Sequence, residues 1–284
     1  MKNFLCLLLV TPWIVGNTTL AQVTRAEQRL SKELVAALSV GNAVQLGAEQ
    51  PFLGIFLEAQ GKKSRGGIIL LHDWDGHADW PDVISPLRQN LPRYGWHTLS
   101  IQLPTAPAYE PTRNDTAQWQ SLEEEISRRI QAAITYYQKK RIFNLVLIGH
   151  QFGAVMAGRF IAKQSADNTI SAVVTLNLIS PANPLWMDRD ANCDLAAGIK
   201  IAFLDIVPDR SPQHVLDLAE TRKTAMTKPG YDKYKQIHII GADYTFRGAE
   251  QTLLSRIRGW LTKLAPSMDV QMTPSAIQPV DVTP

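Results

Sequence analysis

The chain has few cysteines, only two among 284 residues: Cys6 and Cys193. Cys6 lies in an apolar N-terminal run with the features of a cleaved export signal, which leaves Cys193 as the single thiol of the mature protein. A lone cysteine excludes an internal disulfide, so the fold has to be stabilised by its hydrophobic core. Cys193 lies in the acidic segment 188–194, and nearby carboxylates disfavour the thiolate that a catalytic cysteine needs.

The sequence also lacks a marked excess of charge of either sign. It has 29 Lys and Arg and 26 Asp and Glu, for a net charge of +3, and no block or stripe rich in Lys and Arg. A surface that binds nucleic acid usually concentrates positive charge in this way. No nucleic-acid partner is therefore expected.

A hydrophobic run long enough to cross a membrane is missing as well. The N-terminal run Phe4–Val15 follows Lys2 and contains Pro12, whereas a membrane-spanning helix needs roughly 20 apolar residues. Small and polar residues follow it as far as Ala21, which is the arrangement of a secretory signal peptide rather than a membrane anchor. Residues 1–21 are therefore predicted to be a signal peptide. The mature protein is predicted to be periplasmic, with no transmembrane segment.

Hydrophobic patterning predicts an α/β protein. The N-terminal segment 22–39 has helical spacing of its apolar residues. From about residue 67 to 264 short apolar runs alternate with amphipathic stretches, as in a mostly parallel sheet flanked by helices. Strands are predicted at 43–46, 52–59, 67–71, 96–103, 145–148, 172–178, 199–207 and 237–240, and helices at 23–38, 82–94, 118–140, 153–165, 215–227 and 249–264. One α/β domain is therefore predicted over 40–264. The Pro-containing segment 265–284 is predicted to be a disordered tail.

The stretch Asn144–Ala154, NLVLIGHQFGA, has the outline of a nucleophile elbow. Four apolar residues lead into Gly149, and Gly153 lies two residues beyond the apex. This is the spacing of the G-x-S-x-G turn of α/β-hydrolases, in which glycines let a strand and a helix approach closely around a strained apex. The apex residue here is Gln151. A carboxamide has no readily ionised proton and is a poor nucleophile, so covalent catalysis from this position is not expected.

The other two positions of a Ser–acid–His triad follow the elbow in hydrolases. The acid is expected just after the seventh predicted strand, where Asp209 lies, and Asp205, inside that strand, is a weaker candidate. The base is expected after the last predicted strand. Tyr244 stands where the histidine would align, while His238 lies within the strand. A tyrosine, with an ordinary pKa of about 10, is a poor base at neutral pH, so both the nucleophile and the base are predicted to be replaced.

A polar loop, His72–Trp80, follows the predicted strand 67–71. In hydrolases the turn at this place supplies a backbone N–H to the oxyanion hole. The predicted pocket and oxyanion region around the apex consists of His72, Asp73, Trp74, His150 and Phe152. The loop has five histidines and aspartates, but their spacing matches no compact motif such as H-E-x-x-H. A loop-stabilising or pocket-rim role is therefore favoured over a metal site, and no cofactor is predicted. His150 is expected to be a buried, hydrogen-bonded histidine.

Four stretches together resemble a known family. They are the elbow, the loop His72–Trp80, the segment Pro86–Pro104 and the motif GADYTFRGAE at 241–250. They are similar to an exported α/β-hydrolase-like family of unknown function found in gammaproteobacteria, and the resemblance covers roughly residues 40–264. It implies an α/β-hydrolase-like fold and an exported protein, but no substrate. Family members usually have a histidine at the place of Tyr244, so this chain departs from them there. The short segment between residues 178 and 199 predicts a minimal lid.

Two functional hypotheses follow. The first is an exported hydrolase-like protein with a degenerate triad, which binds a small ligand or a periplasmic protein above Gln151 without catalysis. The second is an active hydrolase, such as an esterase, in which His72 or His150 activates water together with Asp73 or Asp209. Only the second needs a histidine within hydrogen-bonding reach of both a carboxylate and the pocket. A third hypothesis, a structural envelope protein that uses the tail as a linker, is supported by the composition of the tail alone.

Overall fold

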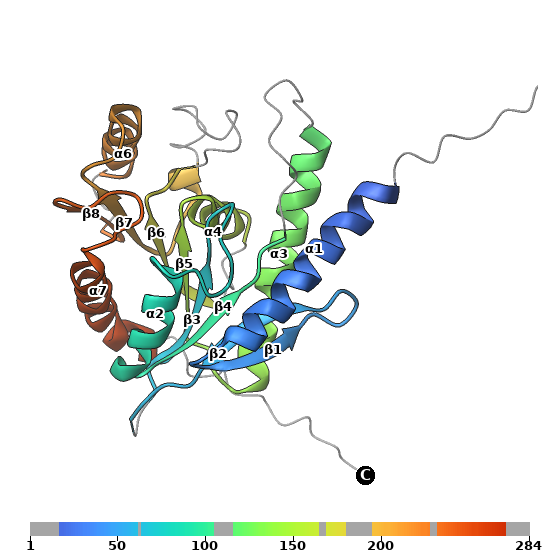
Figure 1. Cartoon of the computed structure of the whole chain (residues 1–284). Helices are drawn as coiled ribbons and strands as arrows, with labels where there is room; N and C mark the ends of the chain where they lie inside the picture. The colour runs from blue at the N-terminus through green and yellow to red at the C-terminus, as the bar shows by residue number, and fades with distance from the viewer. Residues whose placement is uncertain are drawn as a thin grey trace, which may run out of the picture.

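The computed structural model describes residues 17–61, 64–104, 116–164, 169–179, 195–227 and 232–270. Its centre is an eight-stranded sheet with the strand order β1-β2-β4-β3-β5-β6-β7-β8 (Figure 1). The strands are β1 (Asn42–Leu46), β2 (Phe52–Leu57), β3 (Gly66–Leu71), β4 (Trp96–Ile101), β5 (Leu145–His150), β6 (Ile170–Leu176), β7 (Ala202–Pro208) and β8 (Tyr234–Ile239). β1 and β2 pair antiparallel, as do β2 and β4, whereas β4, β3, β5, β6, β7 and β8 run parallel. The predicted mostly parallel sheet is confirmed.

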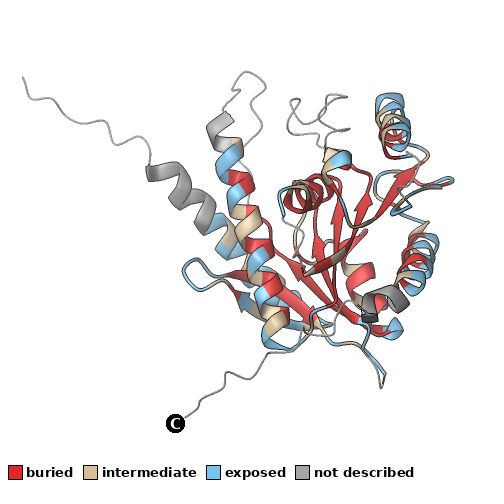
Figure 2. Ribbon diagram, turned by 180° about the vertical axis from the view of Figure 1, so that it is seen from behind, coloured by how far each residue is buried: buried red, intermediate tan, exposed pale blue. Residues whose placement is uncertain are grey.

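Helices cover both faces of this sheet (Figure 1). They are α1 (Asn17–Ala37), α2 (Ile84–Asn90), the 3-10 helix η1 (Leu91–Tyr94), α3 (Thr116–Lys139), α4 (Phe152–Ala162), α6 (Gln213–Met226) and α7 (Glu250–Val270). Side chains of β5 alternate between two apolar clusters: Leu147 packs with α3 and α4, and Val146 and Ile148 pack with α2 and α7. The central strands are therefore buried on both faces, as their continuous apolar runs predict (Figure 2).

Several element boundaries differ from the predicted ones. The predicted helix 82–94 is divided into α2 and η1, where Pro92 lacks the amide hydrogen that a continuous helix would use. β8 begins at Tyr234 rather than at 237. The prediction missed the first three residues because they are polar and half-exposed on an edge strand, so they lack the apolar pattern of a buried strand. α7 continues to Val270, so residues 265–270, which are predicted to belong to the tail, are helical. This part of α7 contains Pro266, and proline usually breaks a helix.

Some predictions lie outside the described residues. These are the signal peptide as far as residue 16, Cys193, most of the short lid segment (180–194) and the tail from 271. The predicted N-terminal helix, in contrast, lies within the described residues. It begins at Asn17, so it includes the predicted cleavage position Ala21 as well as the predicted helix 23–38 up to Ala37. None of the helices in the described part of the chain is both long and apolar enough to span a membrane.

The turn from β5 to α4 has the predicted elbow geometry. Gln151 adopts φ 48° and ψ −110°, a region that residues other than glycine rarely occupy. A Cβ atom on Gly149 would lie 2.2 Å from the carbonyl oxygen of Gly153. A Cβ atom on Gly153 would lie 2.5 Å from the carbonyl oxygens of Leu71 and His72. Glycine at both positions is what lets β3, β5 and α4 meet at this turn.

Replacing Gly149 by alanine is expected to destabilise the protein by about 2–3 kcal/mol, because backbone atoms of β5 and α4 would have to separate. Gly259 in α7 is the matched control, since a Cβ atom there meets nothing within 4 Å. Alanine at 259 is expected to stabilise the helix by about 0.5–1 kcal/mol. Urea denaturation of the two variants measures both effects. An unchanged unfolding free energy for Gly149→Ala would contradict the close approach at the elbow.

Candidate functional site

The side chain at the apex of the elbow is held by a carboxylate from the loop after β3. Gln151 Nε2 donates a hydrogen bond of 2.7 Å to Asp73 Oδ2. The backbone N–H of Phe152 donates to Asp73 Oδ1 at 3.1 Å. In α/β-hydrolases the backbone N–H of the residue after the nucleophile is one of the oxyanion donors. In this chain that N–H is already bound to a carboxylate of the protein itself.

The Asp73 carboxylate is buried, with 9% of the residue exposed. Burial raises the pKa of Asp73 above its ordinary value, while the neighbouring His150 and hydrogen bonds from the backbone of Trp74 and Phe152 act in the opposite direction. The donors from Gln151 and Phe152 therefore satisfy a carboxylate that has lost most of its water. This mutual satisfaction is what a buried polar group needs in order not to destabilise the fold.

His72 fixes the backbone beside that carboxylate. Its Nε2 accepts a hydrogen bond of 2.9 Å from the backbone N–H of Leu103. The ring proton therefore lies on Nδ1, which donates to the carbonyl oxygen of Asp73 at 2.6 Å. Burial lowers the pKa of His72 to about 3, so the ring is neutral. Both ring nitrogens are occupied by backbone groups, so His72 orients the loop and has no nitrogen left to activate water.

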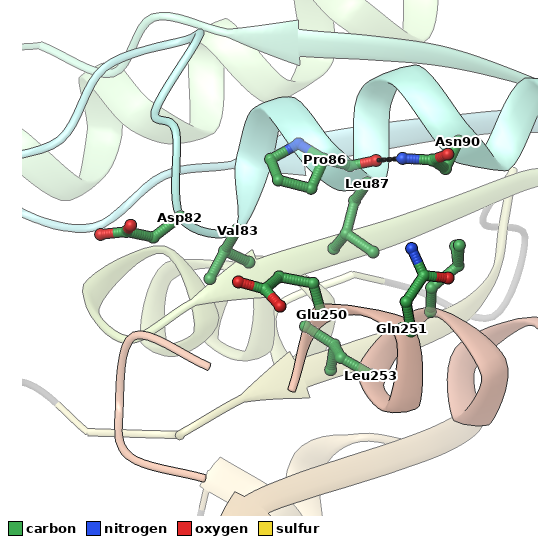
Figure 3. Close-up of a pocket in the computed structure, with 9 residues that line it drawn as sticks. Asp82, Val83, Pro86, Leu87, Asn90, Glu250, Gln251 and Leu253 are labelled. Atoms are coloured by element: carbon green, nitrogen blue, oxygen red, sulfur yellow. Dashed lines mark hydrogen bonds between the residues drawn. The ribbon is translucent and has the colours of Figure 1, made fainter. Parts of the chain in front are cut away.

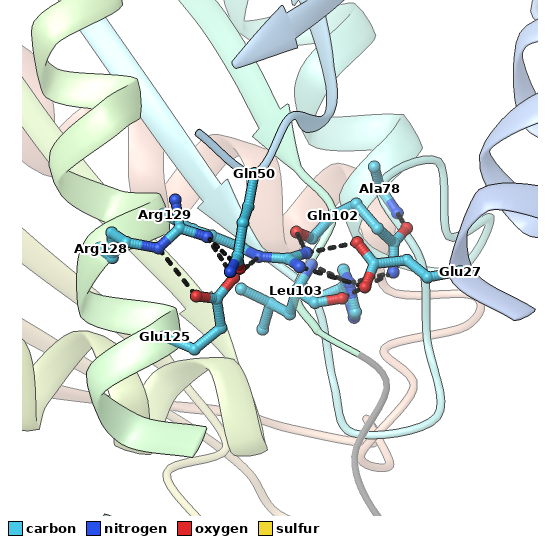
Figure 4. Close-up of polar contacts among 9 residues, drawn as sticks. Glu27, Gln50, Ala78, Gln102, Leu103, Glu125, Arg128 and Arg129 are labelled. Atoms are coloured by element: carbon cyan, nitrogen blue, oxygen red, sulfur yellow. Dashed lines mark hydrogen bonds and ion pairs between the residues drawn. The ribbon is translucent and has the colours of Figure 1, made fainter. Parts of the chain in front are cut away.

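Arg129 of α3 connects the same region to helix α1 (Figure 4). Its guanidinium donates to Glu27 at 2.6 Å, to Glu125 at 2.7 Å and to the carbonyl oxygen of Gln102 at 2.8 Å. The side chain of Gln102 in turn accepts the backbone N–H of Ala78 at 3.1 Å. The loop after β3, the end of β4, α3 and α1 are thus joined through one buried cation. The sequence pairs Glu125 with Arg129 as (i, i+4) neighbours, but the contacts to Glu27 and Gln102 depend on the tertiary fold and were not predicted.

His150 lies directly before the apex and is buried, as expected. Its Nε2 donates a hydrogen bond of 2.7 Å to the backbone carbonyl of Tyr244, which leaves Nδ1 unprotonated. Nδ1 is buried and has no hydrogen-bond partner among the described residues. Burial lowers the pKa of His150, against the opposing effects of Asp73 and of the Tyr244 carbonyl. His150 is therefore a neutral ring that ties the loop after β8 to the elbow.

The predicted acid and base positions are placed differently from a working triad. The side chain of Tyr244 is 53% exposed, and only its backbone carbonyl binds His150. Asp209 Oδ1 accepts the backbone N–H of Gly241 at 2.7 Å, so it stabilises the turn after β8. No hydrogen bond joins Asp209 to Tyr244 or to His150 in the residues that the structure describes.

Asp205 and His238 are placed outside the elbow region, as their positions within strands predict. Asp205 is fully buried in β7, where it pairs with Arg222 of α6 at 3.1 Å and accepts a hydrogen bond from Thr175 at 3.0 Å. It is the centre of a structural network. His238 lies on the half-exposed strand β8, beside Gln236 at 3.3 Å.

Trp74 forms an apolar wall beside the elbow. Its ring meets Phe152 edge-on with a centroid separation of 4.9 Å, and it lies 5.3 Å from Trp119 of α3. The remaining polar residues of the loop are engaged separately: Asp79 pairs with Arg88 at 2.5 Å, and His77 accepts the backbone N–H of Asp79. Across the described ranges no three His, Cys, Asp or Glu side chains are grouped so as to hold a metal ion.

A small cavity lies between α2 and α7, away from the apex (Figure 3). Its volume is about 40 Å³, far below the roughly 300–1,000 Å³ of a typical ligand site. It is lined by Asp82, Val83, Pro86, Leu87, Asn90, Glu250, Gln251, Leu253 and Leu254. Asp82 at its edge pairs with Arg247 at 2.9 Å. This pair links the start of α2 to the loop that also carries Tyr244.

The neutral, buried state of His72 predicts a loss of stability in acid. Its pKa is about 3 in the folded protein and about 6.5 in an unfolded chain, so between these values only the unfolded state binds the proton. Stability from this group is complete above pH 6.5 and falls as the pH drops towards 3. In His72→Gln the unfolding free energy should change less steeply between pH 6 and 4, by about 1.4 kcal/mol per pH unit. Urea denaturation at several pH values measures the slope, and identical slopes would show that His72 is not held neutral.

The model of a family described as a protein of unknown function (DUF3530) matches residues 15–118 and 106–263. No match is found among curated proteins. Among solved structures, Est1E from Butyrivibrio proteoclasticus is 11% identical, with a TM-score of 0.58 over 78% of this chain and 98% of that chain. A dienelactone hydrolase from Anabaena variabilis is 16% identical, with a TM-score of 0.58 over 78% and 97%.

A proline iminopeptidase from Mycobacterium smegmatis is 8% identical, with a TM-score of 0.61 over 80% of this chain and 99% of that chain. At such low identities these likenesses establish the fold alone. The expected α/β-hydrolase fold is confirmed by them and by the strand order of the sheet. The family match covers most of the chain, and the expected resemblance is confirmed. This chain belongs to the family of unknown function DUF3530 and has the α/β-hydrolase fold.

Proposed function

We propose that this protein is an exported, periplasmic α/β-hydrolase-like protein that does not catalyse hydrolysis and binds a small ligand or a periplasmic protein around Gln151. One observation carries the proposal. The Asp73 carboxylate bonds both the Gln151 amide and the Phe152 N–H, which are the groups at the places of the nucleophile and of an oxyanion donor.

Hydrolysis by the mechanism of this fold needs three groups, and none is available at its usual place. A carboxamide replaces the nucleophile at Gln151. A carboxylate at the Phe152 N–H would repel the negative charge that an oxyanion hole has to stabilise. At the place of the base, Tyr244 turns a largely exposed side chain to solvent. The elbow therefore lacks the groups that hydrolysis by this mechanism requires.

Export is proposed from the N-terminal sequence, in which Lys2, the apolar run Phe4–Val15 and the small residues before Ala21 have the order of a signal peptide. N-terminal sequencing of the protein from a periplasmic extract tests this. A chain that begins at Gln22 supports export, and a chain that retains residues 1–21 in the cytoplasmic fraction contradicts it.

An active hydrolase that uses His150 and Asp73 is the second candidate. The observation in its favour is the unprotonated Nδ1 of His150, which is buried without a hydrogen-bond partner in the described part of the chain and is influenced by the charge of Asp73. Against it, neither His72 nor His150 is hydrogen-bonded to a carboxylate within the described residues, and both nitrogens of His72 are occupied. In a histidine that acts as a general base, a carboxylate hydrogen-bonded to the ring orients it and stabilises its protonated form.

Hydrolysis of p-nitrophenyl acetate by the purified protein separates the two candidates. The parent, Gln151→Ala and His150→Gln are all expected to match the rate in buffer, because no activated nucleophile is present. Turnover by the parent that is lost in His150→Gln would establish the second candidate. Turnover that survives both substitutions would place a catalytic site elsewhere. Either result overturns the proposal.

A second test asks whether Asp73 blocks an otherwise usable elbow. The variant Gln151→Ser with Tyr244→His restores the residue types of a triad, and adding Asp73→Gly frees the Phe152 N–H. The triple variant is expected to hydrolyse the ester at least about 100-fold faster than the double variant, the usual effect of one oxyanion donor. Equal rates above that of buffer in the two variants would show that Asp73 does not obstruct the oxyanion position.

A further inference from the structure

A larger cavity lies at the amino ends of the parallel strands, whereas the elbow lies at their carboxyl ends. It is formed where β3 and β5 begin and where α3 ends, whereas Gln151 follows the carboxyl end of β5. Its volume is about 540 Å³, within the range of small-molecule sites. The cavity is therefore separate from the site around Gln151, and what it binds does not depend on whether the elbow is catalytic.

Positive charge dominates the lining of this cavity. Arg65, Lys140 and Arg141 contribute three cations, and Glu58 contributes one carboxylate. None of the ion pairs within the described ranges includes any of the three cations. They come from two short basic segments, Lys62–Arg65 and Lys139–Arg141, that are far apart in sequence and are brought together by the fold. Their charge is available to a ligand.

Aromatic residues hold two of the donors in place. Lys140 Nζ lies 4.9 Å from the ring centroid of Phe56 and 5.3 Å from that of Tyr136. The ring of His97 stacks on the ring of Phe56, with a centroid separation of 5.9 Å. His97 Nδ1 accepts the backbone N–H of Ala59 at 3.1 Å, so the ring proton of the neutral side chain is on Nε2. That N–H is a further donor on a residue that lines the cavity.

Arg141 occupies a backbone position that normally belongs to glycine. The N–H of Ile142 bonds to the carbonyl of Tyr137, and the N–H of Arg141 bonds to that of Gln138. These two bonds define a Schellman motif at the end of α3, with Arg141 at the residue that adopts the left-handed conformation, here with φ 58°. Arginine has no conformational advantage at this residue. An arginine here stabilises the fold less than glycine would, yet it sets a guanidinium at the cavity.

We propose that this cavity binds a phosphate-bearing ligand. Two guanidinium groups, an ammonium and an imidazole N–H provide the charge and the several donors that a phosphate group accepts, and the planar fork of arginine matches its oxygens. The apolar side chain of Phe143, which is 47% exposed, provides a contact for the part of the ligand next to the phosphate. A soluble phosphate compound and a phospholipid headgroup share this chemistry.

Binding of two probes to the purified protein tests the proposal: inorganic pyrophosphate, by calorimetry in 0.1 M salt, and phosphatidylglycerol vesicles, by sedimentation against phosphatidylcholine vesicles. The test variants are Arg65→Gln and Arg141→Gly, alone and together. Arg256→Gln, on the exposed side of α7, removes the same charge elsewhere and is the matched control. Each test substitution is expected to weaken binding about tenfold, the effect of one charge-assisted hydrogen bond. The control should bind as the parent does.

Arg141→Gly also distinguishes a binding role from a structural one, because glycine suits the left-handed residue better than arginine. Its melting temperature should equal or exceed that of the parent while its affinity falls. Binding of pyrophosphate identifies a soluble ligand, and binding of phosphatidylglycerol vesicles alone identifies a lipid headgroup; both support the site. Failure of both probes to bind overturns the proposal, as does binding that the double variant retains or that Arg256→Gln weakens equally.

Discussion

The Asp73 carboxylate, bonded to both the Gln151 amide and the Phe152 N–H, is the interaction on which the chemistry of this protein depends. It joins the loop after β3 to the apex of the elbow. It also gives the buried polar groups of the strained turn a hydrogen-bonded partner within the protein. A hydrolase leaves this place open for the oxygen of its substrate. Here the protein fills it, so the same backbone geometry stabilises the resting structure.

The surroundings of that carboxylate are built to keep it in place. His72 fixes the backbone of Asp73, Leu103 fixes His72, and Arg129 binds the carbonyl of Gln102 next to Leu103. The neutral state of His72 follows from its burial, so this support is intact only while no proton is forced onto the ring. Arg129 extends the support to helix α1 through Glu27 (Figure 4). The position of one loop residue therefore depends on contacts with elements from three separate parts of the chain.

The fold could be predicted from the sequence because its strongest signals are local. Continuous apolar runs identify strands buried on both faces, and Gly149 and Gly153 identify the turn between β5 and α4. The weaker signals gave the errors: the polar start of β8 hid three strand residues, and Pro266 predicted an end that α7 does not have. The residues of the elbow could also be named in advance. The hydrogen bonds between them could not be predicted, because Phe152 and Asp73 are far apart in sequence. The loop after β3 was expected to supply a backbone N–H donor, but it places the Asp73 carboxylate, an acceptor, at this site.

The carboxyl and amino ends of the parallel strands differ in the chemistry of the side chains that lie there. At the carboxyl ends a carboxylate and a carboxamide satisfy each other, and the nearby histidines are buried and neutral. At the amino ends Arg65, Lys140 and Arg141 line an open cavity, and none of them forms an ion pair within the part of the chain that the structure describes. Neither feature is visible as a motif. Each arises where separate segments are brought together by the parallel sheet.

The central claim is that the Phe152 N–H is bound to the Asp73 carboxylate in the resting protein. Heteronuclear NMR of the Phe152 amide during a pH titration measures this most directly. The amide proton should lie downfield and should move as Asp73 titrates, with an apparent pKa above the ordinary value of an aspartate, and Asp73→Asn should abolish the movement. A Phe152 amide that does not respond to pH and keeps its shift in Asp73→Asn would contradict the account, since the oxyanion donor would then be free.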